Sequence, residues 1–109
     1  MENNENRKHL ESIREELEKV YNGELLNEDG EPVSFWEYFD DVLDINYTVN
    51  ADKTYKGVRL LIAFGGPNIY IDTMDQEIQL YWWSDTEKIW LPSEICNEID
   101  SVFEEYYNC

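Results

Sequence analysis

Apolar residues in the first part of the chain recur at the spacing of an α-helix. Between residues 7 and 21 five of them fall on one side of a helical repeat, so they form a single stripe. The stripe consists of Leu10, Ile13, Leu17, Val20 and Tyr21. Gly23 follows and supplies the left-handed conformation that ends many helices. Residues 1–6 are polar and are expected to be frayed.

A second, short helix is predicted over residues 35–42. Ser34 and Glu37 have the spacing of a capping box, in which the serine hydroxyl accepts a hydrogen bond from the amide three residues later. The residues expected on the buried face of this helix are Phe35, Phe39 and Val42.

The middle of the chain alternates between apolar and polar residues, which is typical of β-strands with one buried face. Four such runs cover residues 45–49, 55–64, 69–72 and 77–83, and residues 88–91 can add a short fifth. Gly65-Gly66-Pro67 and other turn-forming residues separate the runs, so an antiparallel meander is predicted. Phe64 is expected on the buried side, and residues 84–87 are expected to form a turn. Only one of Trp82 and Trp83 should face the covered side.

A final helix is predicted after Pro92, with Ser93 as its N-cap. Its expected buried stripe consists of Ile95, Ile99, Val102, Phe103 and Tyr106. Cys96 lies beside this stripe and is interpreted as a small core residue rather than a nucleophile. The order of elements predicts one α+β domain over residues 1–109. It contains a four- to five-stranded antiparallel meander sheet, with N-terminal, short middle and C-terminal helices packed mainly on one face.

The chain carries a large excess of acids. Its 109 residues include 25 acids and 8 bases, which gives a net charge of -17. Residues 22–50 have eight acids and no base, and residues 71–109 have ten acids and one base. The apolar fraction of 42% is too high for a disordered acidic tail. This charge disfavours direct binding to nucleic acid or to an anionic membrane, and leaves a basic protein surface, a cationic ligand or a metal ion as partners.

The sequence also bears on location. The N-terminal region lacks the apolar segment of a signal peptide, and no run approaches the roughly 18 apolar residues of a membrane span. A cytoplasmic location in the host cell is therefore expected. Cys96 and Cys109 do not form a CxxC pair and are expected to be reduced.

Residues with catalytic potential are few. His9 is the one histidine, and no serine or cysteine is placed to use it. Gly65-Gly66 lacks the pattern of a phosphate-binding loop and is interpreted as a turn. We therefore expect no enzyme activity, no catalytic residue and no cofactor.

Carboxylates cluster in two places, at Asp40, Asp41 and Asp44 and at Asp72 and Asp75. Neither cluster has the spacing of an EF-hand, so a dedicated metal site is not predicted, although adventitious Ca²⁺ or Mg²⁺ binding stays open. Paired carboxylates at the separation used by glycosidases arise by chance among so many acids, and they do not indicate an enzyme.

One face of the final helix carries acids at regular spacing. Glu94, Glu98 and Glu105 recur along it, and four residues of a helix advance about 6 Å. This is the scale on which charges follow one another along a nucleic-acid strand. In an average protein such a face is simply solvated, but here few bases are present to neutralise it. Exposed tryptophan and tyrosine side chains would add contact area at an interface.

Three stretches carry a resemblance to known proteins: GGPNIYIDT over residues 65–73, the YWW and Asp85 that follow, and the ending EEYYNC. Over roughly residues 34–109 the chain resembles a family of short acidic uncharacterised proteins carried by phages and conjugative elements of gut Firmicutes. In charge, size and layout it is also similar to the nucleic-acid mimics that act against bacterial defence, namely anti-CRISPR and antirestriction proteins. This second resemblance is one of type and transfers no functional residue, because those inhibitors share no motif.

The resulting prediction is a non-enzymatic inhibitor that places its acidic surface in the basic nucleic-acid-binding groove of a host nuclease, with a Cas nuclease expected first. The predicted partner-binding residues are Asp40, Asp41, Asp44, Asp72, Asp75, Glu77, Asp85, Glu87, Glu98, Glu105 and Trp83. One alternative is a cytosolic interaction or immunity-type module that binds one protein through its aromatic surface. A third is a small metal-dependent hydrolase that uses its carboxylates.

Overall fold

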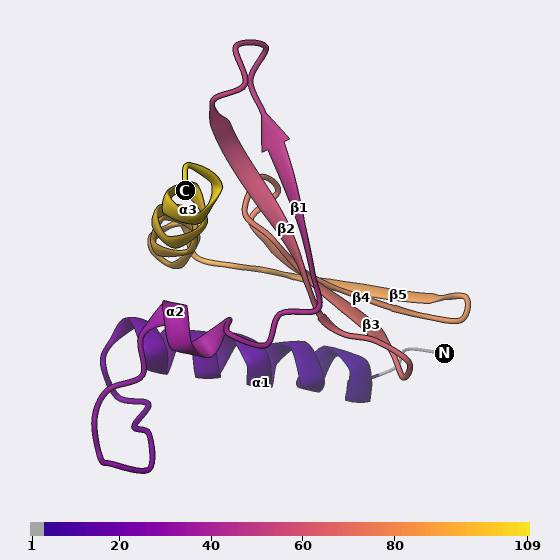
Figure 1. Cartoon of the computed structure of the whole chain (residues 1–109). Helices are drawn as coiled ribbons and strands as arrows, with labels where there is room; N and C mark the ends of the chain where they lie inside the picture. Colours follow the sequence, from indigo (N-terminus) through magenta and orange to yellow (C-terminus); the bar gives the residue numbers. More distant parts are fainter. Residues whose placement is uncertain (1–3) are drawn as a thin grey trace.

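The computed structural model describes residues 4–109 as three helices and a five-stranded sheet (Figure 1). The helices are α1 (Asn4–Tyr21), α2 (Phe35–Tyr38) and α3 (Ser93–Tyr107). The strands are β1 (Asp44–Val49), β2 (Tyr55–Ala63), β3 (Asn68–Asp72), β4 (Glu77–Trp82) and β5 (Asp85–Trp90). The predicted α+β fold with a short middle helix is confirmed.

The strands follow one another in space in their sequence order, β1-β2-β3-β4-β5, and each neighbouring pair is antiparallel. Across the sheet, Leu60 lies opposite Ile71, Ile71 opposite Ile78, and Ile78 opposite Ile89. Directly opposed residues project to the same side of a sheet, and all four are buried. The predicted meander therefore has one continuous apolar face.

Both long helices cover this apolar face. α1 contacts β4 and β5, α3 contacts β2, and the two helices contact each other. Leu17 from α1 and Ile99 from α3 are completely buried in the same core. Figure 1 shows α3 beside β2 and α1 beneath the other end of the twisted sheet, so the helices divide the apolar face between them.

α1 begins at Asn4, so residues 4–6 are helical rather than frayed, and the prediction for residues 1–3 lies outside the described residues. Leu10, Leu17 and Val20 are buried as predicted. Tyr21 is 44% exposed, contrary to prediction, because it is the last residue of the helix and lies at the margin of the core. Gly23 ends the helix as expected, with a left-handed φ of 72°.

α2 is shorter than predicted and ends at Tyr38. Its N-terminus is as expected, because Ser34 Oγ accepts a hydrogen bond of 3.2 Å from the amide of Glu37. Two acids, Asp40 and Asp41, follow the helix, and negative charge opposes the dipole at a helix C-terminus. The chain therefore continues in tight turns instead of further helix.

β2 ends at Ala63, and the prediction that Phe64 shares the buried face was wrong. The pairing with β3 shifts register between Leu61 and Ala63. A bulge of this kind interrupts the strict alternation of sides along a strand. Phe64 is consequently 72% exposed, at the start of the turn that contains Gly65.

A tight hairpin replaces the turn predicted over residues 84–87. Trp82 pairs with Asp85, so only Trp83 and Ser84 form the loop, and β5 begins at Asp85. Trp83 has a φ of 55°, the positive value that the first residue of such loops adopts. Trp82 and Trp83 are both exposed, contrary to the expectation for one of them, because Trp83 lies in the turn and Trp82 at the end of its strand.

α3 begins at Ser93, and its N-cap is Pro92 without a side-chain hydrogen bond. The prediction that Ser93 caps the helix was therefore wrong, and its Oγ instead hydrogen-bonds Gln76 Oε1 at 3.4 Å. The buried residues of α3 are Ile95, Cys96, Ile99 and Phe103. The core interpretation of Cys96 is confirmed. Tyr106 is 54% exposed, contrary to prediction, because the buried stripe turns toward Cys96 and leaves Tyr106 at its edge.

Candidate functional site

The predicted partner-binding residues lie in three regions rather than on one surface. The first comprises Asp40, Asp41 and Asp44, from the end of α2 to β1, and the second comprises Glu98 and Glu105 on α3. The third comprises Asp72, Asp75, Glu77, Asp85, Glu87 and Trp83, around β4. The turns that precede and follow β4 are at opposite ends of this strand, so the third region is itself divided.

Four of these carboxylates are engaged within the chain, and one of them is Asp44, whose Oδ2 accepts a hydrogen bond of 3.1 Å from the side-chain amide of Asn46. Asp72 is 9% exposed, and its Oδ1 accepts hydrogen bonds from the amides of Met74 and Asp75 at 2.9 and 3.0 Å. Glu77 forms an ion pair with Lys88 at 3.6 Å, and Glu87 forms one with Arg7 at 3.5 Å. Asp72 therefore shapes a turn, while Glu77 and Glu87 are partly neutralised.

The remaining predicted acids are exposed, and the two on α3, Glu98 and Glu105, form a row together with Glu94. In residues 4–109 the only ion pairs within 4.0 Å are those of Glu77 and Glu87. Glu94, Glu98 and Glu105 are separated by four and seven residues, so they lie within about 40° of one another around the helix axis. The outer face of α3 thus displays a row of carboxylates without a basic partner among the described residues.

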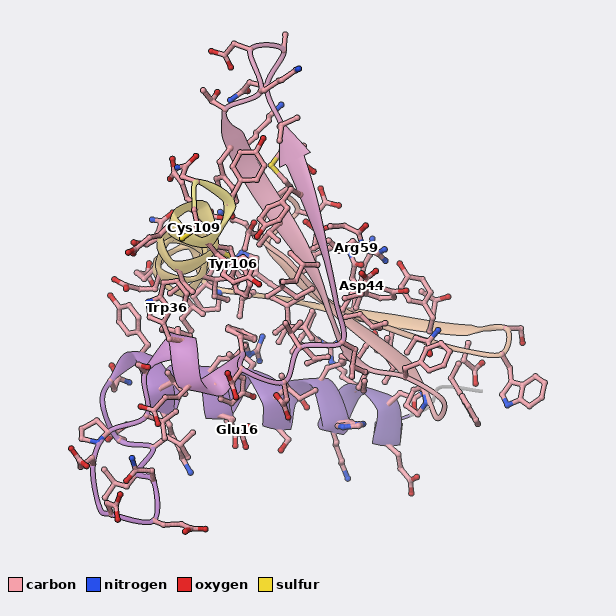
Figure 2. All side chains as sticks on the ribbon, viewed as in Figure 1. Glu16, Trp36, Asp44, Arg59, Tyr106 and Cys109 are labelled. Carbon is pink, nitrogen blue, oxygen red and sulfur yellow. The ribbon has the colours of Figure 1, made fainter. Side chains whose placement is uncertain are left out.

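A pocket of about 250 Å³ lies where α2, α3 and β1 meet, and we call it the α2–α3 groove. Its lining residues are Trp36, Phe39, Asp40, Val42, Ile45, Val102, Phe103 and Tyr106. Phe39 and Phe103 are buried and pack edge to face with ring centroids 5.7 Å apart, so they form its floor. Trp36 and Tyr106 are about half exposed and form its walls. Figure 2 shows both residues where α2 faces α3.

Acidic side chains surround the Trp36 wall of this groove. Asp40 lines the groove itself, and Trp36, Glu37 and Asp40 line a shallower depression next to it. Trp36 also lines a further depression together with Glu98 of α3. No Lys, Arg or His side chain of the described residues lines any of the three. The aromatic wall is therefore set in a negatively charged environment.

A second pocket, of about 310 Å³, lies between α1 and the segment after α2 and contains Glu16, Tyr38 and Asp41. Burial raises the pKa of Tyr38 above its usual range, and the hydrogen bond and negative charge of Glu16 raise it further. Tyr38 thus stays protonated at neutral pH and acts as a structural hydrogen-bonding group.

The sheet face opposite the helices carries a cluster that the sequence did not predict. The guanidinium carbon of Arg59 lies 3.6 Å from the ring centroid of Tyr70, and its Nε and Nη2 donate to Gln79 Oε1 at 3.2 and 3.1 Å. Gln79 donates in turn to Glu77 at 3.1 Å. Figure 2 shows Arg59 and Asp44 together on this side, away from α3. Arg59, Gln79 and Glu77 therefore satisfy part of one another's hydrogen-bonding capacity, and they stabilise a polar surface on this face.

The described residues hold neither a metal-binding cluster nor a reactive thiol at Cys96. No group of three or more His, Cys, Asp or Glu in residues 4–109 is placed to hold a metal ion. Burial, followed by the charges of nearby acids, raises the pKa of the Cys96 thiol to about 12, so it is an inert core group. None of the helices in this part of the chain combines the length and the apolar content that crossing a membrane requires.

Comparison with known proteins found no relative. No family model, no curated protein and no solved structure matches the chain. The resemblance of residues 65–73 and of the acidic ending to mobile-element proteins stays a prediction. Functional arguments for this chain therefore rest on its own surfaces.

Sequence reasoning missed the α2–α3 groove. Its walls come from Trp36 and Tyr106, which are 70 residues apart, and Tyr106 was expected in the core. One local signal was available, since Asp40 follows Trp36 by four residues and one helical turn brings such residues together. That spacing could have indicated an acid beside an aromatic ring.

Proposed function

We propose that this protein is a non-enzymatic inhibitor that binds the basic nucleic-acid-binding groove of a host defence nuclease, with a Cas nuclease as the first candidate. The observation that carries the proposal is the row of unpaired carboxylates on α3 next to the exposed aromatic walls of the α2–α3 groove. The acids supply the charge that attracts phosphate-binding Lys and Arg side chains. The aromatic walls supply the kind of contact area that dominates binding energy at protein interfaces.

The length of the row supports an analogy with one nucleic-acid strand. Glu94 and Glu105 are eleven residues apart, so the row extends over about 16 Å of helix. One DNA strand carries about five phosphates over the same length. Three carboxylates are a sparser charge than this, and the exposed Glu104 at the side of the row increases it. The groove beside the row supplies binding energy that charge alone does not.

Electrostatic attraction of this kind acts mainly on the rate of association. A net charge of -17 produces a long-range field that draws a basic surface toward the protein. At 0.15 M salt the Debye length is about 8 Å, so added salt screens most of this attraction. The proposed binding is consequently fast at low salt and slows steeply as salt increases.

The test measures binding to purified Cas nucleases, and inhibition of their DNA cleavage, between 50 and 500 mM salt. Neutralising the groove and the row in the triple variant Asp40→Asn, Glu98→Gln, Glu105→Gln should weaken binding at least about tenfold, since buried or central charges at interfaces are each worth more than about 0.5 kcal/mol. The protein should also compete with target DNA for binding to the guide-loaded nuclease. The triple variant should compete less well than the natural sequence.

A matched control removes the same number of charges elsewhere. Glu28, Asp29 and Glu31 are exposed in the loop before α2. The variant Glu28→Gln, Asp29→Asn, Glu31→Gln has the same net charge as the first triple variant, so it separates the location of the charge from its amount. Equal losses in both variants, or binding that does not change with salt, would rule out mimicry at α3.

A second candidate function is supported by Trp83. This residue lies at the tip of a hairpin, its side chain is 89% exposed, and its backbone φ is positive. A positive φ in a residue with a large side chain destabilises the folded state, which favours a functional reason for its presence. An interaction module that binds one protein through this aromatic tip would lose far more affinity from Trp83→Ala than from the triple variant Asp40→Asn, Glu98→Gln, Glu105→Gln. The opposite order favours the inhibitor.

A further inference from the structure

We propose that the α2–α3 groove is a receptor for a single arginine side chain of the basic partner. This inference rests on the proposed function, because it names the group through which a basic surface would anchor. The groove brings together four aromatic residues and one carboxylate, at the junction of α2, α3 and β1.

The four aromatic rings line the groove at its floor and walls and leave it open to solvent. Phe39 and Phe103 are 5% and 4% exposed and pack against each other at the bottom. Trp36 and Tyr106 are 46% and 54% exposed, although both carry large apolar surfaces. A ligand that enters between these two walls removes their apolar surface from water, which stabilises the complex.

The size of the groove limits the ligand. Its volume is about 250 Å³, and sites for drug-sized ligands and cofactors are roughly 300–1,000 Å³. It therefore suits one side chain rather than a nucleotide or a large cofactor. The groove is also open to the surface at Trp36 and Tyr106, so a side chain can enter from a protein docked on the outside.

The charge of the groove selects a cation. The faces of aromatic rings carry negative potential and attract cationic groups, and tryptophan does so most strongly. Asp40 lines the groove, Glu37 and Glu98 line neighbouring depressions that Trp36 also lines, and no basic residue of the described chain lies in the lining. An anionic ligand would meet only repulsion here.

Among cationic side chains the geometry favours arginine. The guanidinium is planar, so it can stack on the ring of Trp36 or Tyr106 and still donate two hydrogen bonds to the Asp40 carboxylate. The lysine ammonium is compact and more strongly hydrated, so it gains less from an aromatic site. Lysine is therefore expected to bind, but more weakly.

The test uses the whole protein and a small probe, so that it does not depend on the nuclease. N-acetyl-argininamide is titrated against the ¹⁵N-labelled protein, and the indole N–H signal of Trp36 is followed by NMR. The same titration with N-acetyl-citrullinamide, which is nearly identical in shape but uncharged, is the matched control for the probe. We expect saturable shifts of the Trp36 signal with the arginine probe and at least fivefold weaker binding of the citrulline probe.

Variants locate the binding. Trp36→Ala and, independently, Tyr106→Ser should each weaken binding of the arginine probe about fivefold or more, and Asp40→Asn about two- to fivefold. In Trp36→Ala, which lacks the indole, binding is followed through the backbone amide signals of the other groove residues. Trp90→Ala and Asp29→Asn remove an exposed tryptophan and an exposed acid that do not line the groove, and they should change nothing. The dispersion of the amide signals reports whether each variant is folded.

Several results would overturn the proposal. These are equal binding of the arginine and citrulline probes, equal binding of the corresponding lysine probe, no shift of Trp36, or unchanged binding in folded Trp36→Ala and Tyr106→Ser. Failure of the arginine site can also be distinguished from failure of the proposed inhibitor function. If Trp36→Ala inhibits a nuclease as well as the natural sequence does, the anchoring role fails while the inhibitor stands. If the probe binds as described and no nuclease is inhibited, the arginine site stands and the nuclease is the wrong partner.

Discussion

The phenol of Tyr55 donates a hydrogen bond of 2.6 Å to the carboxylate of Asp100, and this contact ties the first residue of β2 to the middle of α3. Two further tyrosines reinforce the connection. The ring of Tyr107 lies 4.9 Å from that of Tyr47, and the Tyr107 hydroxyl donates to the carbonyl of Lys53 at 2.7 Å. The C-terminal half of α3 is therefore fastened to the β1–β2 hairpin through aromatic side chains.

Removal of the Tyr55 hydroxyl should destabilise the protein. Tyr55→Phe keeps the ring and removes the hydrogen bond to a charged acceptor, so we expect the free energy of unfolding to fall by roughly 1.5–3 kcal/mol. Urea unfolding followed by circular dichroism measures this. Tyr81→Phe, at an exposed tyrosine of the uncovered sheet face, is the control and should change stability by less than about 0.5 kcal/mol.

Stability should decrease in alkaline solution. Burial and the Asp100 contact raise the pKa of Tyr55 above its ordinary value of 10.0, and burial raises the pKa of Cys96 from 9.0 to about 12. The folded state therefore holds these protons more tightly than the unfolded state does. Their contribution is complete below about pH 9 and is lost as the pH rises through the two shifted pKa values.

Melting temperatures between pH 7 and pH 11 test this dependence. We expect a plateau to about pH 9 and a decline above it. In Tyr55→Phe the decline should be shallower, because one of the titrating groups is absent. A melting temperature that stays constant to pH 11 contradicts the assignment.

The uncovered sheet face should depend on Arg59. Arg59→Met keeps much of the aliphatic chain but removes the contact with Tyr70 and both hydrogen bonds to Gln79, which is 6% exposed. We expect a loss of roughly 1–3 kcal/mol in the free energy of unfolding. Lys56→Met, at an exposed base of the same strand, is the control in the same urea experiment. Equal effects of the two substitutions would show that only charge matters.

The β4–β5 hairpin should become more stable without its tryptophan. Trp83 has a φ of 55°, a conformation that costs residues with a Cβ roughly 1–2 kcal/mol. Glycine removes this cost but has a more flexible unfolded state, so Trp83→Gly should raise stability by about 1 kcal/mol. Ser84→Gly, at the neighbouring position without a positive φ, should not stabilise the protein. If the aromatic tip contacts a partner, the same Trp83→Gly substitution weakens binding while it stabilises the fold.

Most of the fold could be predicted because it is encoded by local periodicity. Alternation in β2, β3 and β4 and the glycine turn at Gly65 were sufficient for the meander. The errors arose where a single residue departs from its pattern. Phe64 follows a bulge that no alternation indicates, and Trp83 occupies a loop position that composition assigns to a strand. Tyr106 lies at the edge of a stripe whose direction depends on how α3 packs.

The candidate site was less predictable than the fold. Single acids on α3 could be assigned to an exposed face from helical spacing alone. The groove could not be predicted, because the contact between Phe39 and Phe103 joins segments that are 64 residues apart. The engagement of Asp72 in a turn was hidden for a similar reason, since a carboxylate that accepts two amides has the same sequence signature as one that faces solvent.

The strand order places β1 and β5 at the two borders of the sheet, with no further strand beside either in residues 4–109. Unpaired main-chain groups at such borders allow two copies of a protein to join into a larger sheet. At neutral pH the charge of -17 on every copy opposes their approach. At the sequence pI of about 4.1 the net charge falls to zero and this repulsion disappears, while both borders still lack a neighbouring strand among the described residues. The net negative charge thus opposes aggregation at neutral pH, and mild acid should cause the protein to self-associate.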